Sequence, residues 1–281
     1  MNLANISTIK SLLSAEGFSF KKSLGQNFLI NPTVCPKMAE SSCNENTGVL
    51  EIGPGIGVLT YELAKRAKKV VAIELDERLK KILPKTLGEF ENVEVIFGDA
   101  MKLDLKSIIE EKFSDCESVS VCANLPYYIT SPIIMMLLES RLPITSITVM
   151  VQKEAAVRLC ADVGTRDAGA VTAAVTYYAE KEILFNVGRN SFMPAPNVDS
   201  SVIKLNIRKT PPISVNNEKK FFSLVKACFA QRRKTLLNTV SHTMGISKDT
   251  LRNALNEIGL KETVRGEELT IEQLGQLSNL I

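Results

Sequence analysis

Residues 48–75 read GVLEIGPGIGVLTYELAKRAKKVVAIEL, and this stretch decides the fold. An apolar, β-branched run (48–53) leads into closely spaced glycines, a helical pattern (58–67) follows, and a second apolar run (69–75) comes next. A strand, a tight turn, a helix and another strand in this order predict a right-handed crossover between parallel strands. The stretch therefore predicts an α/β fold built on a mostly parallel sheet.

The same alternation continues over the first three quarters of the chain. Further strand-like runs are expected at 93–99, 118–124, 144–152, 182–188 and 201–208. Because only RNSFMPAPNVDS separates the last two runs, we expect them to form an antiparallel pair that completes a seven-stranded, Rossmann-like sheet. The helical pattern at 77–87 contains Pro84, which we expect near a helix end or a kink.

The alternation of strand-like and helix-like segments stops after residue 209. The linker KTPPISVNN (209–217) is rich in proline and asparagine, and only helical patterns follow it. These patterns are at 218–230, 231–243, 248–258 and 270–280. The sequence therefore predicts one α/β domain over residues 1–209 and a small all-helical domain over residues 210–281.

The composition is that of a soluble protein with a sizeable core, 45% hydrophobic and 23% charged. The first 17 residues lack the features of a secretory signal. We expect them to form a short amphipathic helix instead. Six scattered cysteines without a C-x-x-C pair, and a single histidine, His242, argue against a metal site. We expect a monomer in the cytoplasm, without a membrane segment, a metal or disulfides.

The formal net charge of +3 is concentrated in the last quarter, where residues 210–281 carry 10 basic and 7 acidic side chains. A stripe without acids contains Lys219, Lys220, Lys226, Arg232, Arg233 and Lys234. Two interpretations stay open, a footprint for nucleic-acid phosphates or a solvated helix face.

Three segments at expected strand ends predict a ligand site, because ligands of such sheets bind outside the carboxyl ends of the strands. Gly53 and Gly55 allow close approach of the backbone, and Glu74 follows Gly53 by 21 positions, as an acid that accepts ribose hydroxyls would. Asp99 ends the next run, where it could meet an adenine amino group or simply cap a helix. Without a phosphate-binding loop, these residues favour a nucleoside without phosphates, S-adenosylmethionine.

Residues 123–132, ANLPYYITSP, follow the strand-like run at 118–124. The side-chain oxygen of Asn124 and the backbone carbonyl of Leu125 could accept both N–H groups of an adenine amine. Pro126 would stiffen the turn, and Tyr127 offers a face on which an extruded base can stack. A plain turn whose tyrosines cover the core is the alternative. Methyl transfer at such a site depends on positioning and electrostatics and requires no histidine base.

Eight motifs, in order, resemble the ribosomal RNA adenine N6,N6-dimethyltransferases over roughly residues 20–240, and most closely the bacterial small-subunit member. They are FKKSLGQNFLI, EIGPGIGVLT, AIELD, GDA, ANLPYYITSPI, VQKEAAVRL, SFMPAPNVDSSVIKL and FAQRRKTLLN. The resemblance implies an S-adenosylmethionine-dependent methyltransferase fold. It also implies dimethylation of two adjacent adenines near the 3′ end of 16S rRNA, in the small subunit or its precursor, with a role in subunit biogenesis.

The resemblance also implies roles for individual residues. Cofactor-contacting positions correspond to Asn27, Leu29, Gly53, Glu74, Asp99 and Asn124. Phe192 matches the aromatic that sandwiches the target base opposite Tyr127. Contacts to the RNA backbone fall to Arg232, Arg233 and Lys234 in the helical domain, and Lys21 and Lys22 could extend that surface. The role of Tyr128 stays open.

Three alternatives remain at this point. A 23S rRNA adenine methyltransferase of the resistance type shares the cofactor and Asn-x-Pro-Tyr motifs, although FMPAPNVDS and TRDAGAVTAAVTYY favour the small-subunit family. A DNA adenine methyltransferase is disfavoured, because no further target-recognition segment is present. A ribosome-assembly checkpoint with secondary catalysis is compatible with the main prediction.

Overall fold

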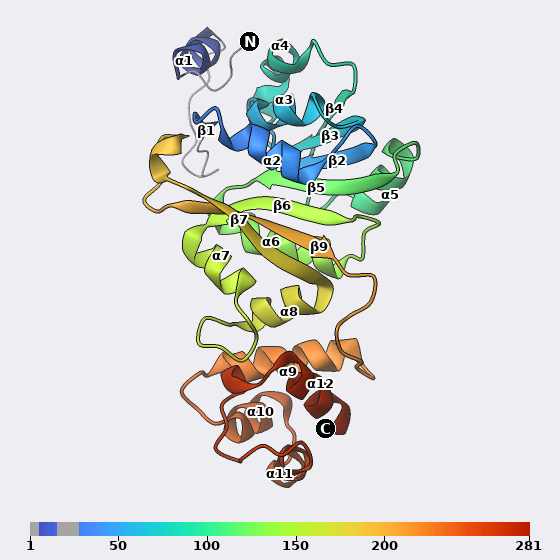
Figure 1. The fold of residues 1–281 in the computed structure, drawn as a ribbon, viewed down its shortest axis with the longest axis vertical. Helices are drawn as coiled ribbons and strands as arrows, with labels where there is room; N and C mark the ends of the chain where they lie inside the picture. Colours follow the sequence, from blue (N-terminus) through green and yellow to red (C-terminus); the bar gives the residue numbers. More distant parts are fainter. Residues whose placement is uncertain (1–5, 16–27) are drawn as a thin grey trace. The chain divides into compact units, whose positions relative to one another are not determined.

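The computed structural model describes residues 6–15 and 28–281 (Figure 1). The predicted positions Lys21, Lys22 and Asn27 lie outside the described residues. The chain forms two compact units. The first contains the described residues up to 156 together with residues 182–207, and the second contains residues 157–181 and 208–281. The division into domains 1–209 and 210–281 stays a prediction.

A seven-stranded sheet forms the centre of the first unit. Its strands are β2 (Thr47–Ile52), β3 (Lys69–Glu74), β4 (Val93–Phe97), β5 (Ser118–Asn124), β6 (Ser146–Gln152), β7 (Ala179–Val187) and β9 (Ser200–Ile207). The strand order is β4-β3-β2-β5-β6-β9-β7, and Figure 1 shows β2, β5 and β6 side by side at its centre. Strands β2 to β6 are parallel, and β9 runs antiparallel to β6. The seven-stranded fold predicted from the sequence is confirmed.

The order of the strands determines where a ligand can bind. The chain proceeds outward from β2 to β3 and β4, and then returns to place β5 on the other side of β2. Sheets that reverse in this way open a crevice at the carboxyl ends of the two central strands. Every residue of β2 is buried, as expected for a parallel strand covered on both faces.

The first unit also contains helices and 3-10 turns, and several of the helices lie against this sheet (Figure 1). They are α1 (Ile6–Ala15), α2 (Val34–Ser42), α3 (Val58–Ala64), η2 (Glu77–Lys81), α4 (Leu83–Leu87), α5 (Leu105–Lys112), α6 (Tyr127–Glu139) and η3 (Arg189–Ser191). One core cluster joins apolar side chains of α2 and α3 to strands β2, β3 and β5. A second cluster joins η2 and α4 to Ile56 and to Leu13 of α1. Pro84 lies at the start of α4, so the expected helix over 77–87 is divided in two.

A second, two-stranded sheet was not expected from the sequence. β1 (Phe28–Leu29) pairs antiparallel with β8 (Phe192–Met193), and Leu29 lies opposite Phe192. Two-residue strands carry no periodic pattern, which explains why sequence analysis missed them. The pairing connects one expected cofactor contact to the expected base-stacking ring.

The second unit is helical. It contains α8 (Ala170–Tyr178), α9 (Glu218–Ala230), α10 (Leu236–Met244), α11 (Lys248–Glu257), η4 (Gly266–Glu268) and α12 (Ile271–Leu280). The boundary between the units, after residue 156, falls within α7 (Lys153–Cys160). Tyr177 and Tyr178 of α8 pack against the rings of Phe221 and Phe222 in α9. Within the described ranges, no helix has both the length and the apolar character needed to cross a membrane.

The expected helix over 231–243 is wrong at its start. α9 ends at Ala230, residues 231–235 form a turn, and α10 begins at Leu236 behind Thr235 in the N-cap position. Gln231 has left the helical region, with φ −138° and ψ 78°. The basic residues 232–234 therefore lie on a turn rather than along a helix face.

Candidate active site

A cavity of about 160 Å³ opens at the carboxyl ends of the central strands. This volume exceeds the space that a single water needs about tenfold, so the cavity can hold an organic ligand. Every described residue that we expected at the site in the first unit lines it. These residues are Leu29, Gly53, Gly55, Glu74, Asp99, Asn124, Leu125, Pro126, Tyr127 and Phe192.

The turn after β2 requires its glycines. Gly53, Gly55 and Gly57 have φ values of 73°, 58° and 89°, a region that side chains with a Cβ rarely adopt. The Gly53 N–H donates to the Ile73 carbonyl at 2.9 Å, and the Gly57 N–H donates to Pro54 at 2.9 Å. The turn is therefore fixed by its own backbone and by β3, with bare backbone facing the cavity.

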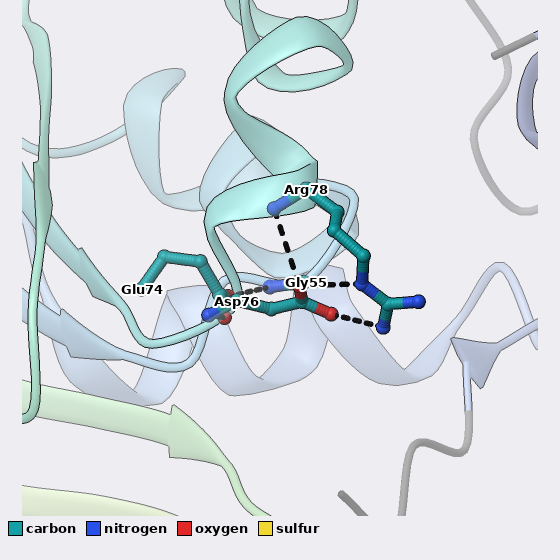
Figure 2. A network of polar contacts seen from close by, with 4 residues as sticks. All are labelled: Gly55, Glu74, Asp76 and Arg78. Carbon is teal, nitrogen blue, oxygen red and sulfur yellow. Dashed lines mark hydrogen bonds and ion pairs between the residues drawn. The ribbon is translucent and has the colours of Figure 1, made fainter. Parts of the chain in front are cut away.

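Glu74 connects this turn to the end of β3 (Figure 2). Its two carboxylate oxygens accept hydrogen bonds from the Gly55 N–H at 3.0 Å and the Asp76 N–H at 2.7 Å. Asp76 in turn holds the guanidinium of Arg78, with Nε–Oδ1 at 2.8 Å and Nη2–Oδ2 at 2.6 Å. The position of the Glu74 carboxylate is thus set without a ligand.

The Glu74 carboxyl can still bind a ligand. Burial raises its pKa, and the hydrogen bonds from Asp76 and Gly55 offset part of that increase. Each carboxylate oxygen has two lone pairs, so the two backbone contacts leave capacity for the hydroxyls of a ribose. The geometry suits the role expected from its spacing to Gly53.

Glu51 is a cavity residue whose importance the sequence analysis did not single out. Its side chain is 1% exposed, and its Oε2 has no hydrogen-bond partner among the described residues. Burial raises its pKa from 4.5 to about 8, with a further increase from the Glu74 charge, while the Thr60 hydroxyl lowers it. An acid within the apolar run GVLEIG was the available signal, because unpaired buried carboxyls are costly. A positively charged ligand group would remove that cost.

The Cys35 thiol also lines the cavity, but it is not a nucleophile. Burial, followed by the charge of Glu51, raises its pKa well above the ordinary value. The thiol therefore stays protonated at neutral pH, and only a thiolate attacks efficiently. Cys35 serves as apolar lining.

Asp99 and two exposed apolar side chains form a further part of the cavity wall. Asp99 accepts a hydrogen bond from the Met101 N–H at 3.0 Å, so it caps its own turn as well as lining the cavity. Leu75 and Met101 are exposed and line the same cavity. Both follow a predicted acid closely, and they are suited to cover the flat faces of a nucleobase. Sequence analysis missed them, since a single apolar residue in a loop gives no pattern.

The Asn124–Tyr127 turn joins β5 to α6 and also lines the cavity. The Asn124 side chain makes no hydrogen bond with any described residue. Tyr127 is half-buried, and its hydroxyl lies 2.7 Å from the hydroxyl of Ser200. Burial raises the Tyr127 pKa, so its phenol is neutral at pH 7. The turn thus presents an unused amide beside a ring that is held in place.

Phe192 closes the cavity from β8. Its side chain is 4% exposed and packs in the core cluster with α2 and α3, so it is a core phenylalanine and a cavity wall at once. The pairing of β8 with β1 fixes it opposite Leu29.

In the basic turn of the second unit, residues 232–234, one side chain binds other parts of the unit and two do not. Arg232 pairs with Glu267, and its Nη2 donates to the carbonyls of Arg166 at 2.5 Å and Ala168 at 3.0 Å. Arg233 and Lys234 are exposed, and their side chains have no hydrogen bond or ion pair within the described part of the chain. Arg232 therefore holds the turn, and its two neighbours keep their charges available.

Comparison with known proteins gives the same picture over the whole chain. The sequence model of a family described as "Ribosomal RNA adenine dimethylase" matches residues 17–281. The chain is 48% identical over 284 residues to "Ribosomal RNA small subunit methyltransferase A" of Geobacillus thermodenitrificans, covering 100% of this chain and 97% of that protein. The protein of the same name from Bacillus pumilus is 48% identical over 276 residues, covering 97% and 94%.

Two solved structures share the fold. A dimethyladenosine transferase from Plasmodium falciparum is similar at a TM-score of 0.72 and 29% identity, covering 89% of this chain and 95% of that one. The 23S rRNA methyltransferase ErmE is similar at a TM-score of 0.69 and 27% identity, covering 90% and 99%. The seven-stranded sheet with an antiparallel β9 is therefore a methyltransferase fold.

Proposed function

Because the chain belongs to the ribosomal RNA adenine dimethylase family, an S-adenosylmethionine-dependent family, we propose that it dimethylates N6 of two adjacent adenines near the 3′ end of 16S rRNA. The observation that carries the proposal is that one cavity contains both Glu74 and Asn124. A carboxylate suited to a ribose and an amide suited to an adenine amine thus face the same space. The substrate assignment follows the small-subunit relatives, which are 48% identical.

The residues of the cavity fit S-adenosylmethionine, which supplies a methyl group activated by a sulfonium. Glu74 would accept hydrogen bonds from the ribose hydroxyls, and Asp99 would lie at the adenine end. A positive charge at the methionine end would lower the pKa of Glu51, so its orphaned carboxyl would ionise and pair with that charge. Leu29 and the glycine turn would provide the remaining walls, with backbone in direct contact.

The Asn124–Tyr127 turn would hold the target. Asn124 Oδ1 and the Leu125 carbonyl would accept the two N–H groups of the adenine amine, which draws its nitrogen toward tetrahedral geometry. Pro126 fixes the turn at φ −55° and ψ 135°. The rings of Tyr127 and Phe192 would stack on the two faces of the base.

The transfer itself would depend on placement. Asn124 Oδ1 and the Leu125 carbonyl would hold the adenine nitrogen where it can receive the methyl group that the cofactor would supply, and the surplus proton of the amine would leave to water. Asn124 holds the nitrogen in position and stabilises its developing positive charge. A side-chain base is unnecessary, since the methylated amine is transiently cationic and acidic.

The second unit would contact RNA. Arg233 and Lys234 are placed to bind phosphates, and such contacts weaken as salt concentration rises. Arg232 would support them from its internal position. We further propose that the protein acts as a monomer in the cytoplasm, on the small subunit or its precursor, with a role in subunit biogenesis.

Methyl transfer from labelled S-adenosylmethionine to small subunits that lack the dimethyladenosines tests the proposal. Large subunits and duplex DNA are assayed in parallel, because the similarity to ErmE makes 23S rRNA the second candidate. We expect label in 16S rRNA as N6,N6-dimethyladenosine. It should disappear with Asn124→Ala and persist with Asn46→Ala, an exposed asparagine outside the cavity. Label confined to large subunits, or no transfer despite cofactor binding, would refute the proposal.

A further inference from the structure

Tyr128 is an aromatic side chain at the cavity to which the proposed reaction gives no role. Seven large apolar or aromatic side chains of the described residues are exposed, and at 61% Tyr128 is the most exposed of them. Three of the seven, Leu75, Met101 and Tyr128, line the same cavity. Single exposed apolar side chains need no explanation, but a group of them around one opening indicates a contact surface.

The two consecutive tyrosines differ in their surroundings. Tyr127 is half-buried and its hydroxyl is held by Ser200, whereas the Tyr128 hydroxyl has no partner within residues 6–15 and 28–281. Successive residues of an α-helix point about 100° apart, and both tyrosines stand in the first turn of α6. Their rings therefore face different directions, and both line the cavity, Tyr127 as the half-buried ring and Tyr128 as the exposed one.

When a target base leaves the stack of its strand, the neighbouring base becomes available to stack on a second ring. An adenine that enters the cavity leaves the base beside it in the strand with one uncovered face. That base is connected by a single phosphodiester link, so it lies at the mouth of the cavity when the target lies inside. Leu75 and Met101 follow Glu74 and Asp99 in the chain, whereas Tyr128 belongs to the turn that carries Asn124 and is the one ring among the three exposed side chains of the cavity.

We propose that Tyr128 is a second stacking platform, which binds the nucleobase adjacent to the target adenine at the mouth of the cavity. The inference rests on the proposed function, because it requires an adenine beside Tyr127. It assigns the two tyrosines separate ligands: Tyr127 holds the base that reacts, and Tyr128 holds its neighbour. A flat, exposed ring is suited to this, because every base has a face on which to stack.

Steady-state methyl transfer to small subunits tests the inference with Tyr128→Ala, Tyr128→Phe and the control Ile183→Ala. Ile183 is exposed and lies outside the cavity. We expect Tyr128→Ala to lower kcat/KM for subunits by about 5- to 150-fold, chiefly through KM, as loss of one base-stacking contact does. Tyr128→Phe keeps the ring and should stay near wild type. Affinity for S-adenosylmethionine, measured by calorimetry, should be unchanged in all three variants.

A change on the RNA side identifies the base. Subunits in which one of the two adjacent adenines is replaced by uracil leave a single target with a smaller, less strongly stacking neighbour. Wild-type protein should lose kcat/KM on these subunits relative to unaltered ones. When kcat/KM is expressed per target adenine, Tyr128→Ala should be nearly insensitive to the same change, because its stacking contact is already absent.

Three results would overturn the inference alone. The first is a wild-type kcat/KM for Tyr128→Ala, and the second is a loss of kcat/KM by Tyr128→Ala that is equal on subunits with an adenine and with a uracil neighbour. The third is a loss of S-adenosylmethionine affinity by Tyr128→Ala that parallels its loss of kcat/KM. The last would assign Tyr128 to the cofactor. Wild-type protein that transfers no methyl groups to small subunits would instead refute the proposed function, and the inference with it.

Discussion

The two ends of the cavity differ in how their polar groups are satisfied. Around Glu74, whose carboxylate accepts two backbone N–H groups, and Asp76, which binds Arg78, the polar groups are paired before any ligand arrives. At the turn after β5, the Asn124 amide has no partner among the described side chains and backbone groups. Tyr128 is open to solvent there.

This difference indicates that the two ends obtain their geometry in different ways. A paired network fixes its members in advance, which lowers the cost of binding a ligand that is used in every cycle. An unpaired amide at a solvent-facing turn keeps its hydrogen-bonding capacity for the substrate. Glu51 is the exception at the cofactor end, a buried carboxyl left for the ligand to neutralise.

The largest effect is expected from Glu51→Gln. Burial raises the Glu51 pKa from 4.5 to about 8, so between these values the folded state retains a proton that the unfolded state has lost. Stability therefore falls as pH rises across this window, and glutamine removes the loss. Above pH 8, Glu51→Gln should raise the free energy of unfolding by on the order of 3–5 kcal/mol, and by almost nothing near pH 4.

Urea unfolding at pH 4.5 and pH 8.5, without cofactor, checks this prediction. The exposed Glu139→Gln is the control and should change stability at neither pH. At pH 8.5, where wild-type Glu51 is ionised, S-adenosylmethionine should stabilise the Glu51→Gln protein less than wild type, since the charge that faces the ligand is gone. A stability gain that is equal at both pH values would contradict a titrating carboxyl.

Asn124→Ala should lower methyl-transfer activity strongly while leaving the stability of the protein almost unchanged. Because the free protein gives this amide no partner in the described structure, its loss should change the free energy of unfolding by less than about 0.5 kcal/mol. Methyl transfer should fall by about 10²–10³-fold, as when one positioned polar group is removed from a reaction site. Thermal unfolding and single-turnover transfer test both halves. A marked loss of stability would mean that the amide is structural.

Glu74→Gln should weaken cofactor binding. Each hydrogen bond to a charged group contributes about 1.5–3 kcal/mol, and the neutral amide loses the charge from two ribose contacts. We expect affinity to fall by about 10²-fold in calorimetry. The matched control is Glu77→Gln, whose carboxylate is exposed and pairs with Lys80 at the surface. Similar losses in both variants would point to overall charge instead of the paired network.

The smallest effect is expected from Tyr127→Phe. It removes the contact to Ser200 but keeps the stacking ring, so stability should fall by about 0.5–1.5 kcal/mol. The kcat should fall only a few-fold. Urea unfolding and transfer kinetics provide the measurements, with Ser200→Ala as the partner variant in a double-mutant cycle. Additive losses in the cycle would show that the two hydroxyls do not act together.

The sequence predicted those parts of the fold that follow from periodic patterns. The strand–glycine–helix–strand stretch at 48–75 predicted the sheet and its ligand edge. The positions of Glu74 and Asp99 at expected strand ends, with the spacing of Glu74 from Gly53, correctly placed both at the cavity. Features that depend on a single residue could not be predicted, because no periodic pattern in the sequence marks them. The unpaired carboxyl of Glu51 and the β1–β8 pairing depend on what surrounds each residue in space.

The basic turn shows the same limit. Helical spacing extended α10 back to residue 231, although α9 ends at Ala230 and Thr235 precedes α10. Charge counting treated Arg232, Arg233 and Lys234 alike. Their difference follows from Glu267 and the carbonyls of 166 and 168, which are distant in sequence.

The pairing of Leu29 with Phe192 has a consequence for synthesis of the chain. Gly53, Glu74, Asp99 and the Asn124–Tyr128 turn are synthesised before Phe192, which follows Tyr128 by 64 residues. At about 5–20 residues per second, this interval lasts roughly 3–13 s. Because β8 does not exist during that interval, a nascent chain lacks both the Phe192 wall and the strand that fixes Leu29, and it completes the cavity late in translation.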